Sequence, residues 1–161
     1  MAGDVTARPA IVLDTNVLVQ SIPSRGRFRP ILEGFDVGRF LMVVSHEILI
    51  EYEEILRAIG GPSAWSAFES LLEFREEHVR RVEPTYFWRA IVHDPDDNTF
   101  VDAAVAGDAE WIVTEDTHFQ ALEIETRLTV RPIQPTRFIA RYLESGGPPE
   151  LDTLAPDRDD R

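Results

Sequence analysis

Acidic side chains follow two short apolar segments of the sequence. Asp14 comes directly after the apolar residues 10–13, and Asp116 lies two residues after the apolar segment 111–114. Apolar runs of this length are typical of buried strands. In open parallel sheets, ligand sites lie at the carboxyl ends of the strands. We therefore expect these two carboxylates to lie close together in space, although they are far apart in the sequence.

Glu51 is a third candidate, and helix geometry selects it. A helix over 45–59, at about 100° per residue, has a buried side marked by regularly spaced apolar residues. These residues are Ile48, Tyr52, Ile55 and Ile59. Glu51 lies near the edge of that side, whereas Glu53 points well away from it. Helix geometry alone slightly favours the alternative, a solvated row that consists of Glu47, Glu51 and Glu54.

Asp97 is a fourth candidate, at the start of a helix predicted over 100–106. The buried side of that helix is marked by Phe100, Val101, Ala104 and Val105. Asp97 falls near the middle of this side, and we expect Asp102 to point away from it. The alternative role for Asp97 is to cap the helix, for which Asp96 competes. A carboxylate at that position can accept amide hydrogen bonds and still face a site.

Several acids gathered in one cleft repel one another, which raises their pKa values. A bound divalent cation removes this penalty. Carboxylate oxygens without sulfur or clustered histidine suit Mg²⁺ or Mn²⁺. Such a site favours hydrolysis of phosphodiesters, because metal ions activate water and stabilise developing charge.

The elements that position these acids alternate between strands and helices. Strands are predicted over 10–13, 40–44, 78–82, 111–114 and 128–133, and helices over 16–22, 30–37, 45–59, 63–74, 100–106 and 135–143. Glycine and proline at 60–62 separate the third and fourth helices. This alternation predicts an α/β fold with a parallel sheet of about five strands, covered by helices on both faces. We expect one domain over 1–145, followed by a frayed C-terminal tail over 146–161 that is rich in Pro, Gly and Asp.

The composition excludes several classes of protein. The chain has 161 residues, 43% hydrophobic and 28% charged, which suits one soluble domain and excludes a disordered chain. It has no cysteine, so thiolate-ligated zinc or iron–sulfur sites and a thiol nucleophile are excluded. The net charge of −13 argues against nonspecific DNA binding through a basic surface. We recognise neither a membrane-spanning segment nor a signal peptide, and therefore expect a cytoplasmic protein.

Other catalytic motifs fit poorly. Residues 94–98 imitate the start of an EF-hand loop, but Thr99 and Val105 replace its glycine and its last glutamate. A phospho-acceptor receiver domain relies on a lysine, and all 16 basic residues of this chain are arginine. GxGxxG, P-loop and GxSxG motifs are absent. The four histidines show no metal-ligand spacing, and only His118, close to Asp116, could sit near the cleft.

Four segments of the sequence resemble the motifs of PIN domains, and they occur in the family's order and approximate spacing. They are Ile11–Asn16 (IVLDTN), Ser45–Tyr52, Asp94–Asn98 (DPDDN) and Ile112–Phe119 (IVTEDTHF). The segment Pro132–Phe138 also resembles the end of the family's sequence, so the resemblance covers roughly residues 10–143. The DPDDN form is similar to that of bacterial VapC-like ribonucleases, the toxin components of toxin–antitoxin systems.

The resemblance implies a three-layer α/β/α fold and an endoribonuclease that depends on one or two Mg²⁺ or Mn²⁺ ions. The family's catalytic and metal-binding residues carry over onto the four acids selected above, Asp14, Glu51, Asp97 and Asp116. Asn16 and Thr114 match polar positions that orient the acids or the attacking water. Asp102 is a further candidate ligand if the helix register differs from the one assumed here.

The same resemblance implies an RNA substrate, a protein antitoxin and, commonly, a homodimer. Arg25, Arg27 and Arg29 form the basic loop nearest the site in sequence, and they are candidates for contact with the RNA backbone; a solvated loop is an equal alternative. Apolar residues around helix 30–37 could instead bind the antitoxin, although core packing is the more common role. They are Phe28, Ile31, Leu32 and Phe35. The alternative function is an RNA- or protein-binding module with little or no turnover.

Overall fold

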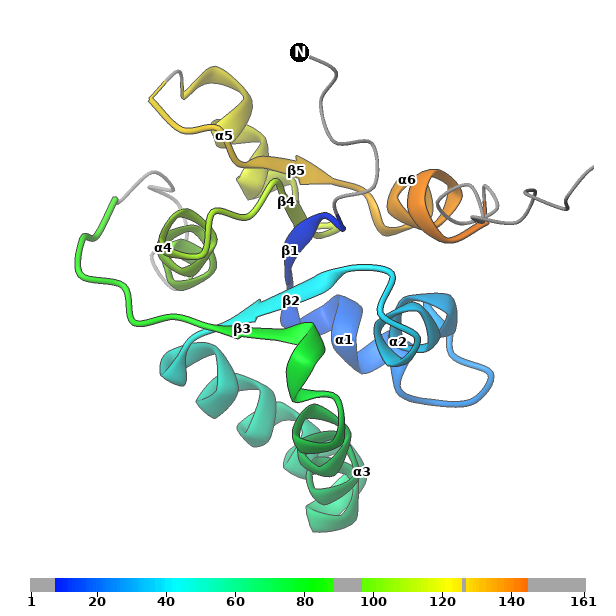
Figure 1. The fold of residues 1–161 in the computed structure, drawn as a ribbon. Coiled ribbons are helices and arrows are strands. Elements are labelled where there is room, and N and C mark those ends of the chain that lie inside the picture. The colour runs from blue at the N-terminus through cyan, green and yellow to red at the C-terminus, as the bar shows by residue number, and fades with distance from the viewer. Residues whose placement is uncertain (1–7, 89–96, 126, 145–161) are drawn as a thin grey trace, which may run out of the picture.

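The computed structural model has a central sheet with helices on both faces (Figure 1). It describes residues 8–88, 97–125 and 127–144. The strands are β1 (Ala10–Leu13), β2 (Leu41–Val44), β3 (Val79–Arg81), β4 (Trp111–Val113) and β5 (Arg131–Ile133). They lie in the order β3-β2-β1-β4-β5, and every neighbouring pair is parallel. All four residues of the central strand β1 are buried and apolar, as expected for a strand covered on both faces. The predicted parallel sheet of five strands is confirmed.

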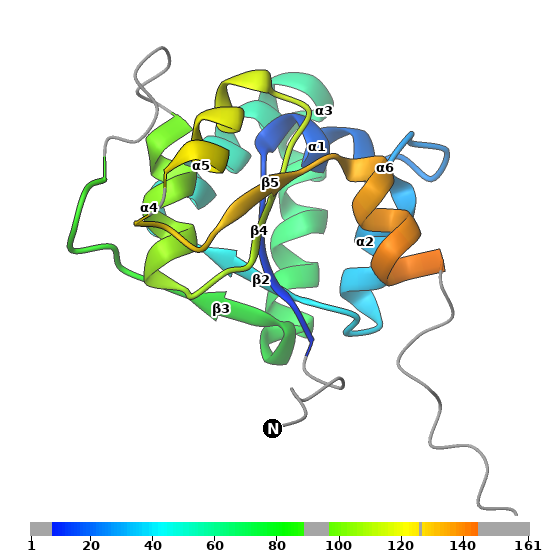
Figure 2. The same cartoon turned by 90° about the horizontal axis from the view of Figure 1, so that it is seen from above.

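Helices cover the two faces of the sheet. They are α1 (Thr15–Ser21), α2 (Arg29–Asp36), α3 (His46–Phe74), α4 (Asn98–Ala106), α5 (Ala121–Ile124) and α6 (Pro135–Phe138). Two short 3-10 helices, η1 (Glu76–His78) and η3 (Thr117–Gln120), and the π-helical turn η4 (Ile139–Glu144) complete the described elements. Figure 2 shows α4 and α5 on one side of the strands and α2 and α6 on the other. The α/β/α architecture is therefore confirmed.

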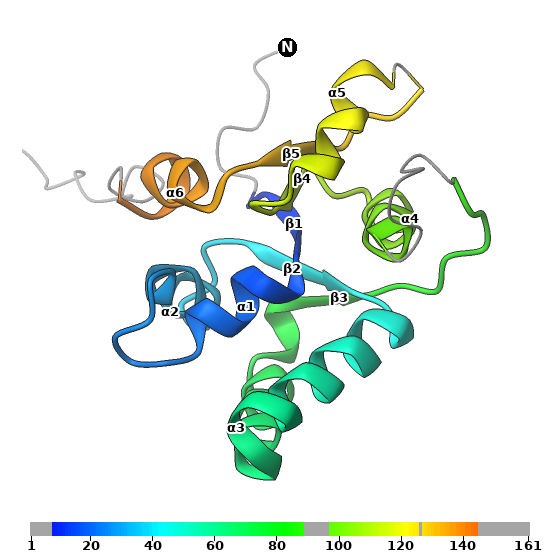
Figure 3. The same ribbon diagram turned by 180° about the vertical axis from the view of Figure 1, so that it is seen from behind.

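Gly61 divides the long helix α3 into two parts. Its φ of 74° and ψ of −177° fall in a region that is open to glycine and costly for other residues, and Pro62 follows it. The break predicted at 60–62 is therefore confirmed. Ile48 and Tyr52 are buried as predicted, but Ile59 is 67% exposed, and the expectation that it lies on the buried side was wrong. The reason is visible in Figure 3, where α3 extends away from the sheet.

The apolar residues around α2 belong to the core. Phe28, Ile31, Leu32 and Phe35 are all buried, with at most 7% of their surface exposed. Phe35 lies against Phe40, with ring centroids 6.2 Å apart, and Phe40 lies against Phe138 at 5.4 Å. These side chains pack between α2, the sheet and α6. The suggestion that they form an exposed surface for an antitoxin was therefore wrong.

Some predicted features lie outside the described residues. Residues 94–96 of the DPDDN segment and the C-terminal tail over 146–161 are among them. Within the described part of the chain, no helix combines the length and the apolar character that crossing a membrane requires.

Candidate functional site

The ends of β1 and β4 place Asp14 and Thr114 side by side. The two strands are parallel neighbours, and the N–H of Asp14 donates to the carbonyl of Val113 at 3.1 Å. The Thr114 hydroxyl donates to Asp14 Oδ2 at 2.7 Å, and Thr114 Oγ1 also accepts the N–H of Asp116 at 2.9 Å. Thr114 is 2% exposed. This one side chain therefore orients Asp14 and fixes the turn that carries Asp116, the two acids expected to meet at this edge of the sheet.

Asp14 is a buried carboxylate in a negative environment. Only 8% of the residue is exposed. Burial raises the pKa of the Asp14 carboxyl, the hydrogen bond from Thr114 offsets part of the rise, and the charges of Asp116 and Glu51 raise it further. Hydrogen bonds place both acids close by, because the N–H of Asp116 donates to the same Thr114 hydroxyl and Thr15, next to Asp14, donates to Glu51. A cation bound among them would favour the ionised form of Asp14.

Helix α3 brings Glu51 to the end of β1. The Thr15 hydroxyl, in the first turn of α1, donates a short hydrogen bond to the Glu51 carboxylate. The neighbouring Tyr52 is fully buried, and its hydroxyl donates to the carbonyl of Leu13. Burial and the charges of Asp14 and Glu51 raise the pKa of Tyr52, which keeps the phenol protonated as a donor. Glu51 is thus held at the edge of the buried side of α3, and the solvated row of glutamates does not describe it.

Asp97, Asp116 and His118 form a group on the other side of the site. The His118 Nδ1 atom lies 3.5 Å from Asp116 Oδ1 and 3.8 Å from Asp97 Oδ2. One oxygen of each carboxylate and one ring nitrogen lie within 4.8 Å of one another, close enough to share a metal ion. The N–H of His118 also donates to Asp116 Oδ1 at 2.9 Å, so Asp116 caps the start of η3. The structure therefore brings all four predicted acids to one end of the sheet.

His118 is the site residue that sequence analysis left open. Its position two residues after Asp116 was the one indication that it belongs to the site. The side chain of Asp116 accepts the backbone N–H of His118, which keeps His118 close to the acids. Helical or strand periodicity could not show this, because η3 is a single short turn of four residues.

Asp102 has a different place from the one predicted. It is 6% exposed and accepts the backbone N–H of Trp88 at 2.8 Å, so the expectation that it points away from the buried side was wrong. The physical reason is that Trp88 belongs to an extended segment, which covers this side of α4. Burial raises the pKa of Asp102, and the hydrogen bond from Trp88 offsets part of the rise. Asp102 therefore fastens this segment to α4.

The remaining predicted residues differ in their surroundings. Asn16 is exposed in the first turn of α1, one residue beyond the Thr15 that holds Glu51. In the basic loop, Arg27 forms an ion pair with Glu115 at 3.0 Å, and Arg29 donates to the carbonyl of Ile22 at 2.6 Å. Arg25 is exposed. Two of the three arginines are thus engaged within the protein.

The sequence matches the model of the PIN domain over residues 10–118, a range that contains all four acids. This chain belongs to the PIN domain family. No curated protein matches it.

Two solved structures with a TM-score of 0.50 support the fold of this PIN domain, and a third is similar at a lower score. FitAcB from Neisseria gonorrhoeae is 15% identical, with a TM-score of 0.50 over 78% of this chain and 98% of the other. FitAB bound to an IR36 DNA fragment is 16% identical, with a TM-score of 0.50 over 78% and 94% of the two chains. VapBC2 from Rickettsia felis, bound to a DNA fragment from its promoter, is 15% identical, with a TM-score of 0.48 over 78% and 99%. At this level of identity the similarity concerns the fold alone.

Proposed function

We propose that this PIN domain is an endoribonuclease that uses divalent metal ions to hydrolyse RNA phosphodiesters. The observation that carries the proposal is the convergence of four carboxylates from separate elements at one end of the sheet, where burial and the neighbouring acids raise the pKa of Asp14. Buried acids in mutual repulsion are costly for the fold. Such an arrangement is therefore characteristic of a site that binds cations.

The residues present fit Mg²⁺ or Mn²⁺. Carboxylate oxygens predominate, and the described residues near them include no sulfur ligand. The acids that would hold one or two ions are Asp14, Glu51, Asp97 and Asp116. A bound ion would supply Lewis acidity that activates water and offsets charge on the phosphate.

The protein itself contributes side chains that fix the orientation of these acids. Thr114 fixes Asp14, and Thr15 fixes Glu51. The His118 side chain lies between Asp97 and Asp116, where it would hold the two carboxylates in position. We assign to Asn16, exposed next to Thr15, the role of orienting the acids or the attacking water. Preorganised groups of this kind avoid the cost of reorientation during reaction.

Cleavage of labelled single-stranded RNA with Mn²⁺ or Mg²⁺ tests this proposal. We expect cleavage by the wild-type protein, loss on addition of chelator, and loss in Asp14→Asn. Asp36→Asn is the matched control, because Asp36, the last residue of α2, pairs with Arg75 after α3, and its substitution changes the charge equally. RNA binding without cleavage, with metal binding confirmed separately, would contradict the nuclease and favour the binding module.

We further propose that the protein is the toxin of a toxin–antitoxin pair, acting in the cytoplasm and silenced by a protein antitoxin. The DPDDN segment and its companion motifs support this role, because they resemble the toxin subgroup. The homodimer that the same resemblance implies stays a prediction. Co-expression with candidate antitoxins, with growth as the readout, tests the toxin role. Growth arrest by the wild-type protein but not by Asp14→Asn supports the toxin, whereas arrest by Asp14→Asn contradicts it.

A further inference from the structure

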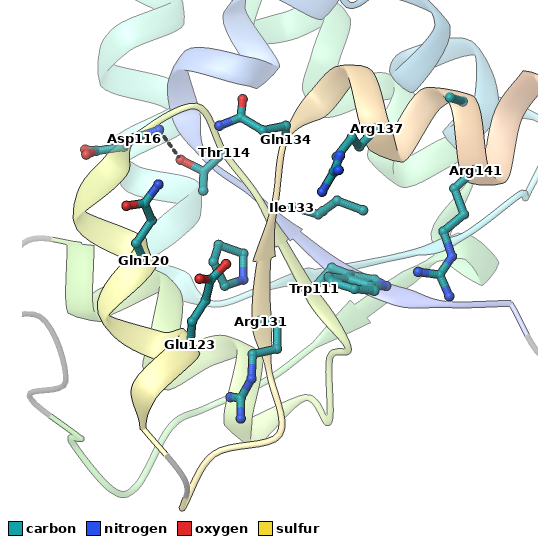
Figure 4. Close-up of a pocket in the computed structure, with 12 residues that line it drawn as sticks. Trp111, Thr114, Asp116, Gln120, Glu123, Arg131, Ile133, Gln134, Arg137 and Arg141 are labelled. Carbon is teal, nitrogen blue, oxygen red and sulfur yellow. Dashed lines mark hydrogen bonds between the residues drawn. The ribbon is translucent and has the colours of Figure 1, made fainter.

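A hollow of about 880 Å³ opens beside the acidic site, between η3, β5 and the α6–η4 segment (Figure 4). Thr114 and Asp116 line one end of it. Figure 4 shows Arg137 and Arg141 on the opposite side, extending from the α6–η4 segment toward Ile133 and Trp111. We call this space the β5–α6 hollow. The hollow adjoins the site at Thr114 and Asp116, and in Figure 4 the carboxylate of Asp116 points away from the hollow, toward its outer end.

Among the described residues, two of the three arginines of the hollow have no acidic partner. In the part of the chain that the structure describes, neither Arg137 nor Arg141 forms an ion pair with an acidic side chain. Both are exposed. The third arginine, Arg131, donates to the carbonyls of Leu128 and Val130 and contributes to lowering the pKa of Glu125, so it is partly engaged. Arg137 and Arg141 therefore place two cationic side chains on one wall of the hollow.

Aromatic side chains hold Arg141 in place. Its guanidinium lies over the ring of Trp111, 5.4 Å from the centroid, and 5.2 Å from that of Tyr142. The indole N–H of Trp111 donates to the Tyr142 hydroxyl at 2.9 Å, which fixes the two rings relative to each other. A guanidinium stacked on aromatic rings keeps its N–H groups available for an anion. Arg141 is therefore preorganised to bind an acidic group.

We propose that the β5–α6 hollow binds the RNA strand next to the cleaved bond, with Arg137 and Arg141 contacting its phosphates. This inference rests on the proposed nuclease function, and it assigns to the α6–η4 segment the role that sequence analysis gave to the loop of Arg25, Arg27 and Arg29. Arginine suits phosphate because its N–H groups match the oxygens in pairs. Phosphates that flank the cleaved one need cationic partners, and the hollow supplies them beside Asp116.

The position of the hollow beside the acids favours RNA over an acidic protein segment. A carboxylate of a bound peptide would be repelled by Glu123, which lines the hollow, and a peptide has no regular series of anionic groups to reach both the arginines and the acidic site. A nucleic acid strand instead has a regular series of phosphates, of which one can lie at the acids with metal ions while others meet the arginines. Glutamine side chains at 120 and 134 line the same hollow and offer neutral donors to sugars or bases.

The test measures binding of a fluorescein-labelled oligouridine by anisotropy in the presence of EDTA, so that cleavage does not interfere. Each phosphate contact on a single strand contributes about 0.7 to the slope of log affinity against log salt, so Arg137→Gln/Arg141→Gln should reduce the slope by about 1.4 and weaken binding roughly 25-fold at 0.1 M salt. Arg137→Lys/Arg141→Lys keeps the charges and should retain the slope. Thermal unfolding of each variant verifies the fold.

The matched control is Arg57→Gln/Arg81→Gln, which removes the same charge elsewhere. Arg57 pairs with Glu53 on α3, and Arg81 is exposed on β3, at the opposite edge of the sheet from β5. We expect this variant to bind as the wild type does. An equal loss in both double variants, no loss in Arg137→Gln/Arg141→Gln, or no oligouridine binding by the wild type would each overturn the assignment.

A cleavage assay with Mn²⁺ separates this inference from the proposed function. If the wild type binds through the two arginines but does not cleave, the nuclease is contradicted and the binding surface stands. If the wild type cleaves and Arg137→Gln/Arg141→Gln cleaves with the same kcat/KM, the nuclease stands and the binding surface is contradicted. We expect cleavage by both, with a KM raised in the variant in proportion to its weaker binding.

Discussion

At the scale of single residues, Thr114 couples two acids through one hydroxyl. Thr114→Val keeps the shape of the side chain but leaves an oxygen of the buried Asp14 and the N–H of Asp116 without this partner. We expect the free energy of unfolding to fall by about 1–3 kcal/mol, the usual cost of an unsatisfied buried polar group. Cleavage should also fall, because Asp14 loses the bond that orients it. Urea denaturation and single-turnover cleavage measure the two effects.

Thr114→Ser is the control for this prediction, because it retains the hydroxyl and removes only a methyl group. It should keep most of the cleavage activity, even if the lost methyl lowers stability slightly. If the valine variant were as stable and as active as the serine variant, the hydroxyl would not be what orients Asp14.

At the scale of elements, Gly61 sets the direction of the second part of α3. Its φ of 74° favours glycine, and a Cβ added there would meet no atom within 4 Å. Gly61→Ala should therefore lower the free energy of unfolding through backbone strain alone, by about 1–3 kcal/mol. Ala58→Ser, at an exposed position just before the kink, should cost about 0.5 kcal/mol. Urea denaturation compares them, and equal costs would mean that the kink relaxes when the glycine is lost.

Sequence could predict the strands and helices whose apolar residues show a strand-like run or a helical spacing. The apolar residues before Asp14 and before Asp116 predicted neighbouring strand ends. The spacing of Ile48 and Tyr52 put Glu51 near the edge of the buried side of α3, where the structure has it, although helix geometry alone slightly favoured a solvated row of glutamates. In each case the apolar pattern lies within a single strand or helix, and the contact of the acid that follows it is set by that element's place in the sheet.

The features that sequence could not predict depend on contacts with loops and extended segments, whose residues show neither helical nor strand periodicity. Asp102 is buried because an extended segment lies over α4, and nothing in the spacing around Trp88 indicates that segment's course. The pair Arg27–Glu115 joins two loops in the same way. Ile59 fits the helical pattern but lies beyond the part of α3 that the sheet covers.

At the scale of the whole molecule, the repulsion among the acids makes stability depend on pH and on metal. The pKa of Asp14 is raised in the folded protein, so its contribution to stability is present below its pKa in the unfolded chain and is lost as pH rises through the folded value. Without metal, Asp14→Asn should therefore be more stable than the wild type at neutral pH. This advantage should shrink as the pH is lowered toward the ordinary range of aspartate.

Mn²⁺ should reverse this order. Ligand at 100-fold excess over its Kd stabilises a folded protein by about 2.7 kcal/mol, and a domain of this size gains roughly 2–4 °C in Tm per kcal/mol. The wild-type Tm should rise accordingly, whereas Asp14→Asn, which lacks one ligand charge, should respond much less. Asp36→Asn and NaCl at matched ionic strength serve as controls, since general screening would act on all three proteins alike. Equal shifts in the wild type and Asp14→Asn would mean that the ion acts on the overall charge of −13 rather than at the four acids.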